Sequence, residues 1–521
     1  MRRAPGADHA RRTAAALGLA AFLLYALTGG GRIVGSDEVT MLELSRAMLQ
    51  GRIDVPEGAT LRGPDGRYYT KNSAGQALAA LPLVAVAEGA ANAAGLPPAR
   101  RELAVRFLAS FFDAVVAALL LATFTLAARR LGIAPRPALV AGAMLGLTTP
   151  LWVYAKSFMG EPLQALGLLL ALTGAARARA GEPRAERLAG AGAALAVAVK
   201  LSMLPLALGC LLPLARVPAA ERRRWAWPAG AVALALLFHL AYDFARFRNP
   251  LETGYGAQAT PAAYGTPLLV GLYGLLLSSG KGLLWFAPMV WLVPFGLGAG
   301  GARGGAAGEP RPAAAAIAAR GALVPVALAL ALYATFEHWA GDGSWGPRYL
   351  VPVLPLLALA VARALEGASR ARRAAALALG LAGLAVQIAG VAIYFGAEMR
   401  EVGDYPYTLA LGDPRFMSDS HWNPAFSPIR GHWRMLSRNL GEHLRGEAPR
   451  LEVGGAADPR LGIDPGDQQR LLHALDFWWA YALYAGVPGG VVAAAALALA
   501  VALALAIARL ARRVREETRA P

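Results

Sequence analysis

The stretch 102–130, ELAVRFLASFFDAVVAALLLATFTLAARR, decides the class of fold. Residues 102–128 are predominantly apolar and long enough to cross the hydrocarbon core of a bilayer, which takes about 20 helical residues. The stretch ends on Arg129 and Arg130. Arginines at the end of a span mark its cytoplasmic side. The stretch therefore predicts a transmembrane helix that ends in the cytoplasm.

The composition extends this pattern to the whole chain. The 521 residues are 56% hydrophobic and 16% charged, whereas soluble domains carry roughly 25% charged residues. The formal net charge of +17 comes mainly from arginine, since only four of the 51 basic residues are lysines. The arginines cluster in short loops between apolar runs, which indicates membrane orientation rather than binding of nucleic acid. Cys210 is the only cysteine, which excludes an intrachain disulfide and a cysteine-based zinc site.

Twelve apolar segments predict an all-α polytopic membrane protein with about 12 transmembrane helices. They fall near 13–30, 102–128, 136–154, 161–178, 187–199, 200–215, 225–245, 267–299, 314–336, 348–364, 372–396 and 476–511. Lys200 and Pro205 favour two short helices over one long helix between 187 and 215. Residues 1–12 are basic, and we expect the first helix to be retained with its N-terminus inside.

One further apolar stretch, 76–95, sets the topology. Basic loops lie at 127–137, 176–187, 216–224, 302–320 and 367–373. If 76–95 crossed the membrane, the first three of these loops would fall outside. We therefore expect 76–95 to lie in the outer interface, all of 31–101 to be periplasmic, and both termini to be cytoplasmic.

The chain then divides into three regions. Residues 1–396 form the predicted transmembrane core, 397–474 a periplasmic element rich in Pro, Gly, Trp and His, and 475–521 the last helix with a cytoplasmic tail. No internal repeat is visible, which weakens a transporter interpretation. This topology predicts a multi-pass protein of the cell membrane.

Acidic residues open two of the predicted outer helices. Asp37 and Glu38 follow Ser36, a predicted N-cap, and Glu161 precedes Pro162 at the start of an apolar helix. Acids stabilise helix N-termini electrostatically, so a structural role is open for each of them. Their position at the outer membrane face also suits a catalytic acid or base.

The four lysines, Lys71, Lys156, Lys200 and Lys281, lie inside apolar segments or at their edges. An ionisable residue at such depth is a functional candidate, and we expect the set to hold an anion. Lys156 also suits a side chain that reaches back to the membrane surface.

One arginine joins this set. Arg348 begins a helix after Trp345-Gly346-Pro347, where a cation opposes the helix dipole unless an anion completes the site.

In order and spacing these motifs resemble the GT-C glycosyltransferases over roughly residues 13–365, most closely the lipid A aminoarabinose transferases and protein O-mannosyltransferase relatives of bacteria. The matching elements are Asp37-Glu38, Tyr69-Thr70-Lys71, Glu161-Pro162-Leu163, Val199-Lys200 and Arg348-Tyr349-Leu350-Val351-Pro352. Lys71 is followed by Asn72 where the family usually has proline. The second acidic motif has Glu161 for Asp and lacks one residue before the proline.

The resemblance implies transfer of a sugar from a polyprenyl-phosphate donor to an acceptor hydroxyl at the periplasmic face of the bacterial inner membrane. Asp37, Glu38 and Glu161 are then the catalytic candidates, and Asp37 is the expected base. Lys71, Lys200, Lys281 and Arg348 would bind the donor phosphate, and Tyr69, Trp345 and His421 the acceptor. No metal ligands are assigned, and two roles are open for Glu161, orienting the acceptor or holding a divalent metal.

Two alternatives belong to other classes. A transporter or flippase of an anionic lipid-linked substrate would use the same cations as a transit path, but would be expected to show repeats and a midplane polar site. A polymerase-like membrane enzyme of unrelated fold is the smaller alternative. The sugar, the acceptor and the lipid are not specified by any of these motifs.

Overall fold

The computed structural model describes residues 5–58, 60–216, 223–298, 314–404, 413, 415, 417–451 and 469–519. These residues are almost entirely helical. The two strands that the described ranges contain, β1 (Leu61–Arg62) and β2 (Tyr68–Tyr69), pair antiparallel with Leu61 opposite Tyr69. They close the turn at Asp65-Gly66 that precedes Lys71.

The first part of the chain carries the helices that build most of the core. They are α1 (Pro5–Thr28), α2 (Ser36–Leu49), α3 (Gly75–Ala93), α4 (Pro98–Ala109), α5 (Phe112–Arg130), α6 (Pro135–Leu147), α7 (Leu151–Tyr154), α8 (Glu161–Arg179), α9 (Ala185–Val199), η1 (Leu201–Met203), α10 (Leu204–Leu211), η2 (Leu212–Arg216) and α11 (Ala226–Phe247).

The second part contains more short helices. They are η4 (Gly256–Ala259), η5 (Pro261–Tyr264), α12 (Leu268–Leu277), α13 (Leu283–Phe286), η6 (Pro288–Leu292), α14 (Val293–Gly298), α15 (Ala314–Gly321), α16 (Leu323–Thr335), η7 (Arg348–Val353), α17 (Leu354–Leu365), α18 (Arg370–Ala392), α19 (Phe395–Glu401), α20 (Ser418–Trp422), η8 (Pro424–Phe426), α21 (Pro428–Leu444), η9 (Leu471–His473), α23 (Trp478–Tyr484) and α24 (Gly489–Arg519).

Eight helical stretches of the described residues are long and apolar enough to cross a membrane. They are Asp8–Thr28, Gly75–Ala93, Pro98–Arg130, Arg223–Phe247, Ala314–Thr335, Arg348–Leu365, Arg370–Ala392 and Gly489–Glu517. The protein is therefore an all-α multi-pass membrane protein. The count of 12 crossings stays a prediction, and so does the interfacial position of 76–95, because Gly75–Ala93 meets the same criteria of length and composition.

Of the remaining predicted spans, 161–178 is the single helix α8, whereas others are interrupted. The predicted break at Lys200 is confirmed: α9 ends at Val199, and Lys200 is extended with φ −155° and ψ 124°. The single segment expected over 267–299 is instead divided among α12, α13, η6 and α14, with breaks at Ser278–Gly282 and Ala287. Residues 217–222 and 302–313 of two predicted basic loops, and 405–412, 414, 416 and 452–468 of the predicted periplasmic element, lie outside the described residues.

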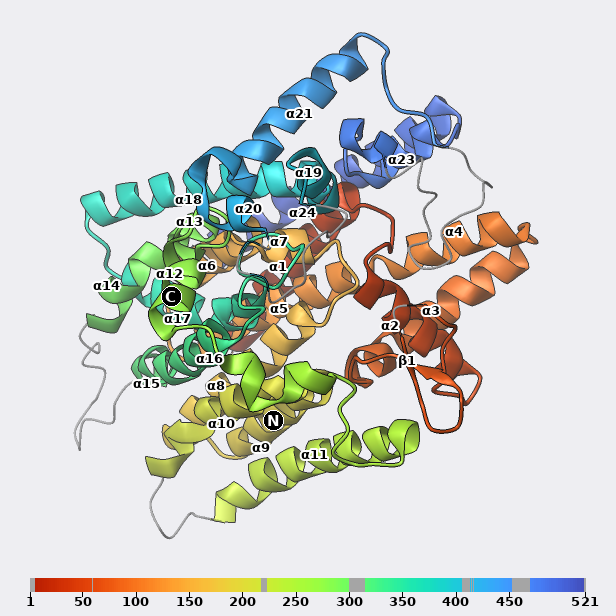
Figure 1. The fold of residues 1–521 in the computed structure, drawn as a ribbon. Coiled ribbons are helices and arrows are strands. Elements are labelled where there is room, and N and C mark those ends of the chain that lie inside the picture. Colours follow the sequence, from red (N-terminus) through yellow and green to blue (C-terminus); the bar gives the residue numbers. More distant parts are fainter. Residues whose placement is uncertain are drawn as a thin grey trace, which may run out of the picture.

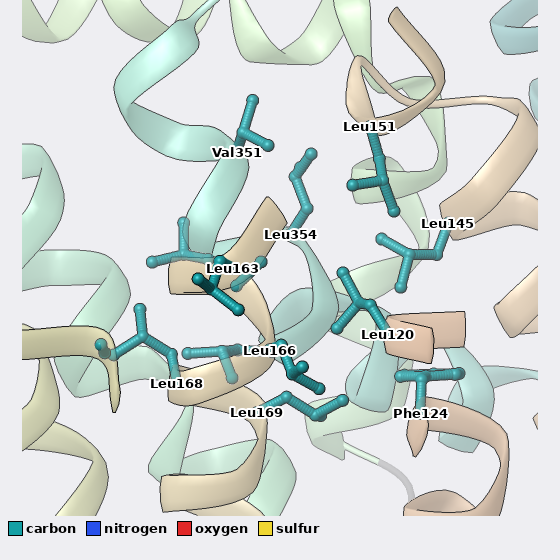
Figure 2. Packing of buried hydrophobic residues seen from close by; sticks show 14 of the residues in the cluster. Leu120, Phe124, Leu145, Leu151, Leu163, Leu166, Leu168, Leu169, Val351 and Leu354 are labelled. Carbon is teal, nitrogen blue, oxygen red and sulfur yellow. The ribbon is translucent and has the colours of Figure 1, made fainter. Parts of the chain in front are cut away.

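The central bundle packs around α8. Figure 1 shows α1, α5, α6 and α17 at the centre of the molecule, with α3 and α4 to the right, α11 along the bottom and α21 at the top. Figure 2 shows the packing beside α8, where Leu163 lies near Leu354 of α17, with Val351 of η7 above them. The starts of α8 and η7 therefore lie together, although far apart in sequence.

Small residues bring α8 and α9 into close contact. A Cβ on Gly174 would lie 2.5 Å from the backbone nitrogen of Ala189, and one on Gly167 would lie 2.7 Å from that of Ala196. Small residues at helix interfaces allow this approach within membranes. The tight pair fixes the start of α8, which carries Glu161, relative to the end of α9, which precedes Lys200.

Candidate functional site

A polar cavity of about 400 Å³ opens among segments from distant parts of the chain. Five of the residues singled out in the sequence line it together: Asp37, Lys71, Glu161, Lys200 and Arg348. The other polar or aromatic lining residues are Asn72, Ser73, Gln76, Phe158, Gln164, Ser202, His239, Asp243, Arg246, Thr253, Tyr255, Gln258, Tyr264, Tyr333, Phe336, His338, Asp342 and Tyr349.

Asp37 lies in the first turn of α2 and carries two cationic neighbours. Gly35, not Ser36, precedes the helix as its N-cap. The carboxylate oxygens of Asp37 lie 3.7 Å from Lys71 Nζ and 3.6 Å from Arg348 Nη2. Burial favours a higher pKa for Asp37, but the charges of Lys71 and Arg348 outweigh it, so the pKa lies below its ordinary value. Asp37 is therefore ionised at neutral pH.

Arg348 bridges the two acids. Its Nε donates to Glu161 Oε1 at 2.6 Å, while its Nη2 faces Asp37. The side chain of Glu161 is 4% exposed, and its Oε2 has no hydrogen-bond partner among the described residues. A buried carboxylate oxygen of this kind is costly unless it is paired, so Glu161 retains one acceptor for a hydroxyl or for an N–H of Arg348.

Three of these five residues are cations, Lys71, Lys200 and Arg348. Among the residues that the structure describes, Lys200 alone of the three has no carboxylate partner. Lys71 and Arg348 each lie within 4.0 Å of an acid, but Lys200 forms no ion pair there, and its Nζ lies 5.1 Å from the ring centroid of Tyr349. The helix break after Val199 turns this lysine toward the cavity. The site thus has an ammonium group free to bind an anion.

Two charged residues of the cavity lining, Asp243 and Arg246, were not identified from the sequence. Arg246 is 2% exposed, donates to the carbonyl of Thr70 and pairs with Asp243 one helical turn earlier. Arg246 therefore fixes the backbone just after β2, next to Lys71. An Asp-x-x-Arg pair near the end of the apolar helix α11 is the signal that could have found it.

Glu38, predicted to be catalytic, does not line the cavity. Its Oε2 accepts the N–H of Gly35 at 2.8 Å, and its Oε1 accepts the N–H of Phe158 at 2.8 Å. The residue is 7% exposed. Both oxygens bind backbone, so Glu38 joins the start of α2 to the segment before Glu161.

Lys281, predicted to bind phosphate, lies behind the cavity. It is 1% exposed. Its Nζ donates to the carbonyls of Asp342 and Ser344 at 2.9 and 2.6 Å. These acceptors belong to the loop that precedes Arg348. Lys281 therefore holds that loop and does not reach the space where a ligand would lie.

The three residues predicted for the acceptor also lie outside the cavity lining. Tyr69 donates its hydroxyl to Asp65 at 2.6 Å. Trp345 donates from Nε1 to Gln387 at 3.1 Å and is 2% exposed. His421 is buried against Trp339. Each is packed by the core, so the aromatic residues that do line the cavity are others, such as Tyr255 and Tyr349.

Lys156 forms a buried ion pair instead of reaching the membrane surface. Its Nζ lies 2.9 Å from Asp476 Oδ2 and also donates to the carbonyl of Val391 at 2.7 Å. Arg32 binds the other oxygen of Asp476 at 2.7 Å. Asp476, far along the chain, could not be identified as a partner from local sequence. Its pKa is lowered, because the charges of Arg32 and Lys156 outweigh the effect of burial.

Two further features bear on ligands. A second cavity of about 550 Å³ lies between α2, α3 and α4, but its charged residues are paired with one another, Arg46 with Glu88 and Glu102, and Arg101 with Glu88. Within the described ranges no group of three His, Cys, Asp or Glu side chains could hold a metal ion.

No protein-family model matches the chain, and no curated protein does. Two crystal structures do, those of ArnT from Cupriavidus metallidurans bound to undecaprenyl phosphate and in the apo state. They cover 96% and 95% of this chain and 76% and 75% of their own, each with 16% identity and a TM-score of 0.47. ArnT is one of the GT-C enzymes that the motif order resembles. At a TM-score below 0.5 the match assigns neither an activity nor residues to this chain.

Proposed function

We propose that this protein is a membrane glycosyltransferase that moves a sugar from a polyprenyl-phosphate donor to an acceptor hydroxyl. The observation that carries the proposal is the meeting of three cations, Lys71, Lys200 and Arg348, with the ionised Asp37 in one cavity. A lipid phosphate supplies the anion that Lys200 lacks. The motif order of the sequence supports the same chemistry.

In the proposed reaction the acceptor oxygen attacks the anomeric carbon of the sugar. Its proton passes to a carboxylate oxygen of Asp37 as the new bond forms. The bond from the anomeric carbon to the phosphate oxygen breaks, and the lipid phosphate leaves with the electron pair. Attack opposite the leaving group inverts the anomeric centre. The low pKa of Asp37 keeps it ionised before the reaction, so proton transfer accompanies the attack.

The cations stabilise the leaving group. Charge develops on the phosphate oxygens as the bond breaks, and fixed cations in a site of low water content are a large catalytic contribution. Lys200 offers free donors, while Arg348 offers a planar group already held by Glu161. Glu161 in this proposal keeps Arg348 oriented.

Sugar hydroxyls would find partners among four lining residues, Asn72, Tyr255, Gln258 and His338. Tyr255 donates its hydroxyl to Asn72 at 3.3 Å, and Gln258 lies 3.1 Å from His338 Nε2. Amide, imidazole and phenol groups can each both donate and accept, as recognition of a polyol requires. We place the sugar ring against these residues.

A transfer assay tests the proposal. Purified protein in detergent is offered a panel of radiolabelled polyprenyl-phosphate sugars with a mixed lipid and glycan acceptor pool. We expect wild type to transfer label from one donor, Lys200→Ala to lose most of this activity, and the charge-retaining control Lys200→Arg to recover part of it. Movement of a lipid-linked sugar across vesicles without any transfer would instead establish a flippase.

A further inference from the structure

The segment 157–160 connects α7 to α8 and ends directly before Glu161. Its backbone is bonded to side chains from three separate helices. The N–H of Phe158 donates to Glu38 on α2 at 2.8 Å, and the N–H of Met159 donates to Asp113 on α5 at 2.7 Å. The carbonyl of Phe158 accepts from Gln76 on α3 at 2.7 Å.

The most informative of these side chains is Asp113. It is fully buried in the apolar helix α5. Its Oδ2 accepts from Met159 N and from Ser157 Oγ at 3.2 Å, and its Oδ1 has no hydrogen-bond partner in the part of the chain that the structure describes. Burying a carboxyl group is costly unless its bonds compensate. Among the residues that the structure describes, the polar groups bonded to Asp113 all lie in 157–160, so this segment gives the residue its role.

The segment is also confined on its other side. A Cβ on Gly160 would lie 2.9 Å from Val199 Cγ1 and 3.0 Å from Gln164 Nε2. Together with the bonds to Glu38, Gln76 and Asp113, this contact leaves little freedom for the residue that follows. That residue, Glu161, binds Arg348 Nε at 2.6 Å.

We propose that Asp113, with Glu38 and Gln76, positions Glu161 for its ion pair with Arg348. None of the three is a catalytic residue in this role, because each acts on the backbone of 157–160. Since Arg348 also faces Asp37 at 3.6 Å, the arrangement sets the angle of the guanidinium between the two acids. The positioning itself does not depend on the proposed function; only its effect on transfer rests on that function.

A double-mutant cycle tests the positioning of Glu161. Asp113→Ala removes the acceptor for Met159 N–H, whereas the conservative variant Asp113→Asn keeps an oxygen in the same place. Glu161→Gln removes the ion pair. If Asp113 acts through Glu161, Asp113→Ala should lower the thermal unfolding temperature less in the Glu161→Gln background than in wild type, because interacting residues are not additive. Asp113→Asn should restore most of the loss.

Thr125→Val serves as the matched control. Thr125 is also buried on α5, but its hydroxyl donates to its own helix at Leu121 O. Its effect on the unfolding temperature should be the same with and without Glu161→Gln. Equal losses from Asp113→Ala in the two backgrounds would overturn the proposal, since Asp113 would then be merely structural.

The transfer assay adds a second, independent arm. Displacement of Arg348 by about 1 Å would slow transfer by about a hundredfold. We therefore expect Asp113→Ala to slow transfer strongly in the wild-type background and less than twofold in the Glu161→Gln background. Coupling in unfolding temperature without any transfer by wild type would leave the positioning intact and overturn the proposed function. Additive unfolding data would overturn the positioning even if transfer were observed.

Discussion

The four lysines divide between two regions: Lys71 and Lys200 line the cavity wall, whereas Lys156 and Lys281 belong to what we call the packed layer, the buried side chains that do not line the cavity. On the wall, Lys71 lies 3.7 Å from Asp37, and Lys200 has no carboxylate partner in the described ranges. In the packed layer, Lys156 lies 2.9 Å from Asp476 and Lys281 donates to two carbonyls. An ammonium group has three N–H donors. Those of the wall remain open to a ligand, while those of the layer are used by the protein.

The neighbouring acids Asp37 and Glu38 differ in the same way: Asp37 lines the cavity wall, and Glu38 lies in the packed layer. Asp37 faces cations across the cavity, and Glu38 accepts two backbone N–H groups. Adjacent positions on one helix thus belong to different regions. The comparison predicts that changes on the wall alter activity directly, whereas changes in the packed layer alter stability and affect transfer only through the position of Glu161 and Arg348.

The largest expected effect is at Asp37. Asp37→Asn should slow transfer by about 10²–10⁴-fold, because an amide takes up no proton. The variant keeps the side-chain size and should stay folded, but its unfolding temperature should fall modestly, because it gives up about 0.3–1 kcal/mol of dipole interaction and the charge that faces Lys71 and Arg348. Transfer rate and thermal unfolding measured on the same preparation check both expectations.

Glu38→Gln is the neighbouring control. Its amide nitrogen would face a backbone N–H where the carboxylate now accepts, so it should lower the unfolding temperature. Its direct effect on proton transfer should be small. Wild-type turnover by Asp37→Asn would contradict the base assignment and move that role to Glu161.

The next effect is on stability, at Asp476. Asp476→Asn leaves the buried cations Arg32 and Lys156 without their shared counter-ion. Breaking a buried ion pair by removing one partner costs about 3–5 kcal/mol. We expect a clear fall in the thermal unfolding temperature in detergent. Glu447→Gln, which removes an exposed partner of Arg445, should leave the temperature unchanged, and an equal fall in both variants would contradict the role of burial.

The third effect is on donor affinity. Lys200→Ala and Lys71→Ala should each weaken binding of a polyprenyl phosphate by about ten- to a hundredfold, the loss of a charge-assisted contact of about 1.5–3 kcal/mol. Titration of detergent-solubilised protein with the lipid phosphate measures it. Lys281→Met should instead lower the unfolding temperature, because the carbonyls of Asp342 and Ser344 lose their donor. Unchanged affinity in both Lys200→Ala and Lys71→Ala would contradict the proposal that these lysines bind the donor phosphate.

The last effect is a pH dependence of stability, and it concerns a buried acid outside the cavity that has no ion-pair partner like those of Asp476. Glu398 on α19 is fully buried, and neither carboxylate oxygen has a hydrogen-bond partner among the described residues. Burial, and then the charge of Asp404, raise its pKa from 4.5 to about 8. Between these values the folded protein holds a proton that the unfolded chain releases. Stability therefore falls as pH rises from about 4.5 to 8, by at most about 1.4 kcal/mol per pH unit.

Glu398→Gln should remove this dependence. The variant should unfold at a higher temperature than wild type at pH 8 and show a much smaller difference at pH 5. Thermal unfolding of both proteins across this range measures the effect. Parallel curves would show that Glu398 is ionised in the folded protein with partners of its own.

The sequence alone determined the membrane class and several helix ends. Apolar runs with flanking arginines identified seven of the eight long apolar helices, and the eighth, Gly75–Ala93, was noticed as apolar. The break at Lys200 followed from a lysine and a proline within an apolar run. Helix starts at Glu161 and Arg348 followed from local signals, and the start of α2 was predicted one residue late, at Asp37 instead of Ser36. These features depend on neighbours along the chain, whose geometry is fixed by hydrophobicity, proline and the helix dipole.

Only the tertiary structure decided which charged residues face the cavity. Glu161 and Arg348 are 187 positions apart and meet because α8 packs beside η7. Lys156 does not face the cavity, because its Nζ donates to the carbonyl oxygen of Asp476, 320 positions along the chain. Lys156, which is bonded to carbonyls, and Lys200, which lines the cavity, both lie at the edge of an apolar segment. Their difference arises from the packing of helices distant in sequence, because burial and hydrogen-bond partners belong to the folded arrangement and not to any one segment.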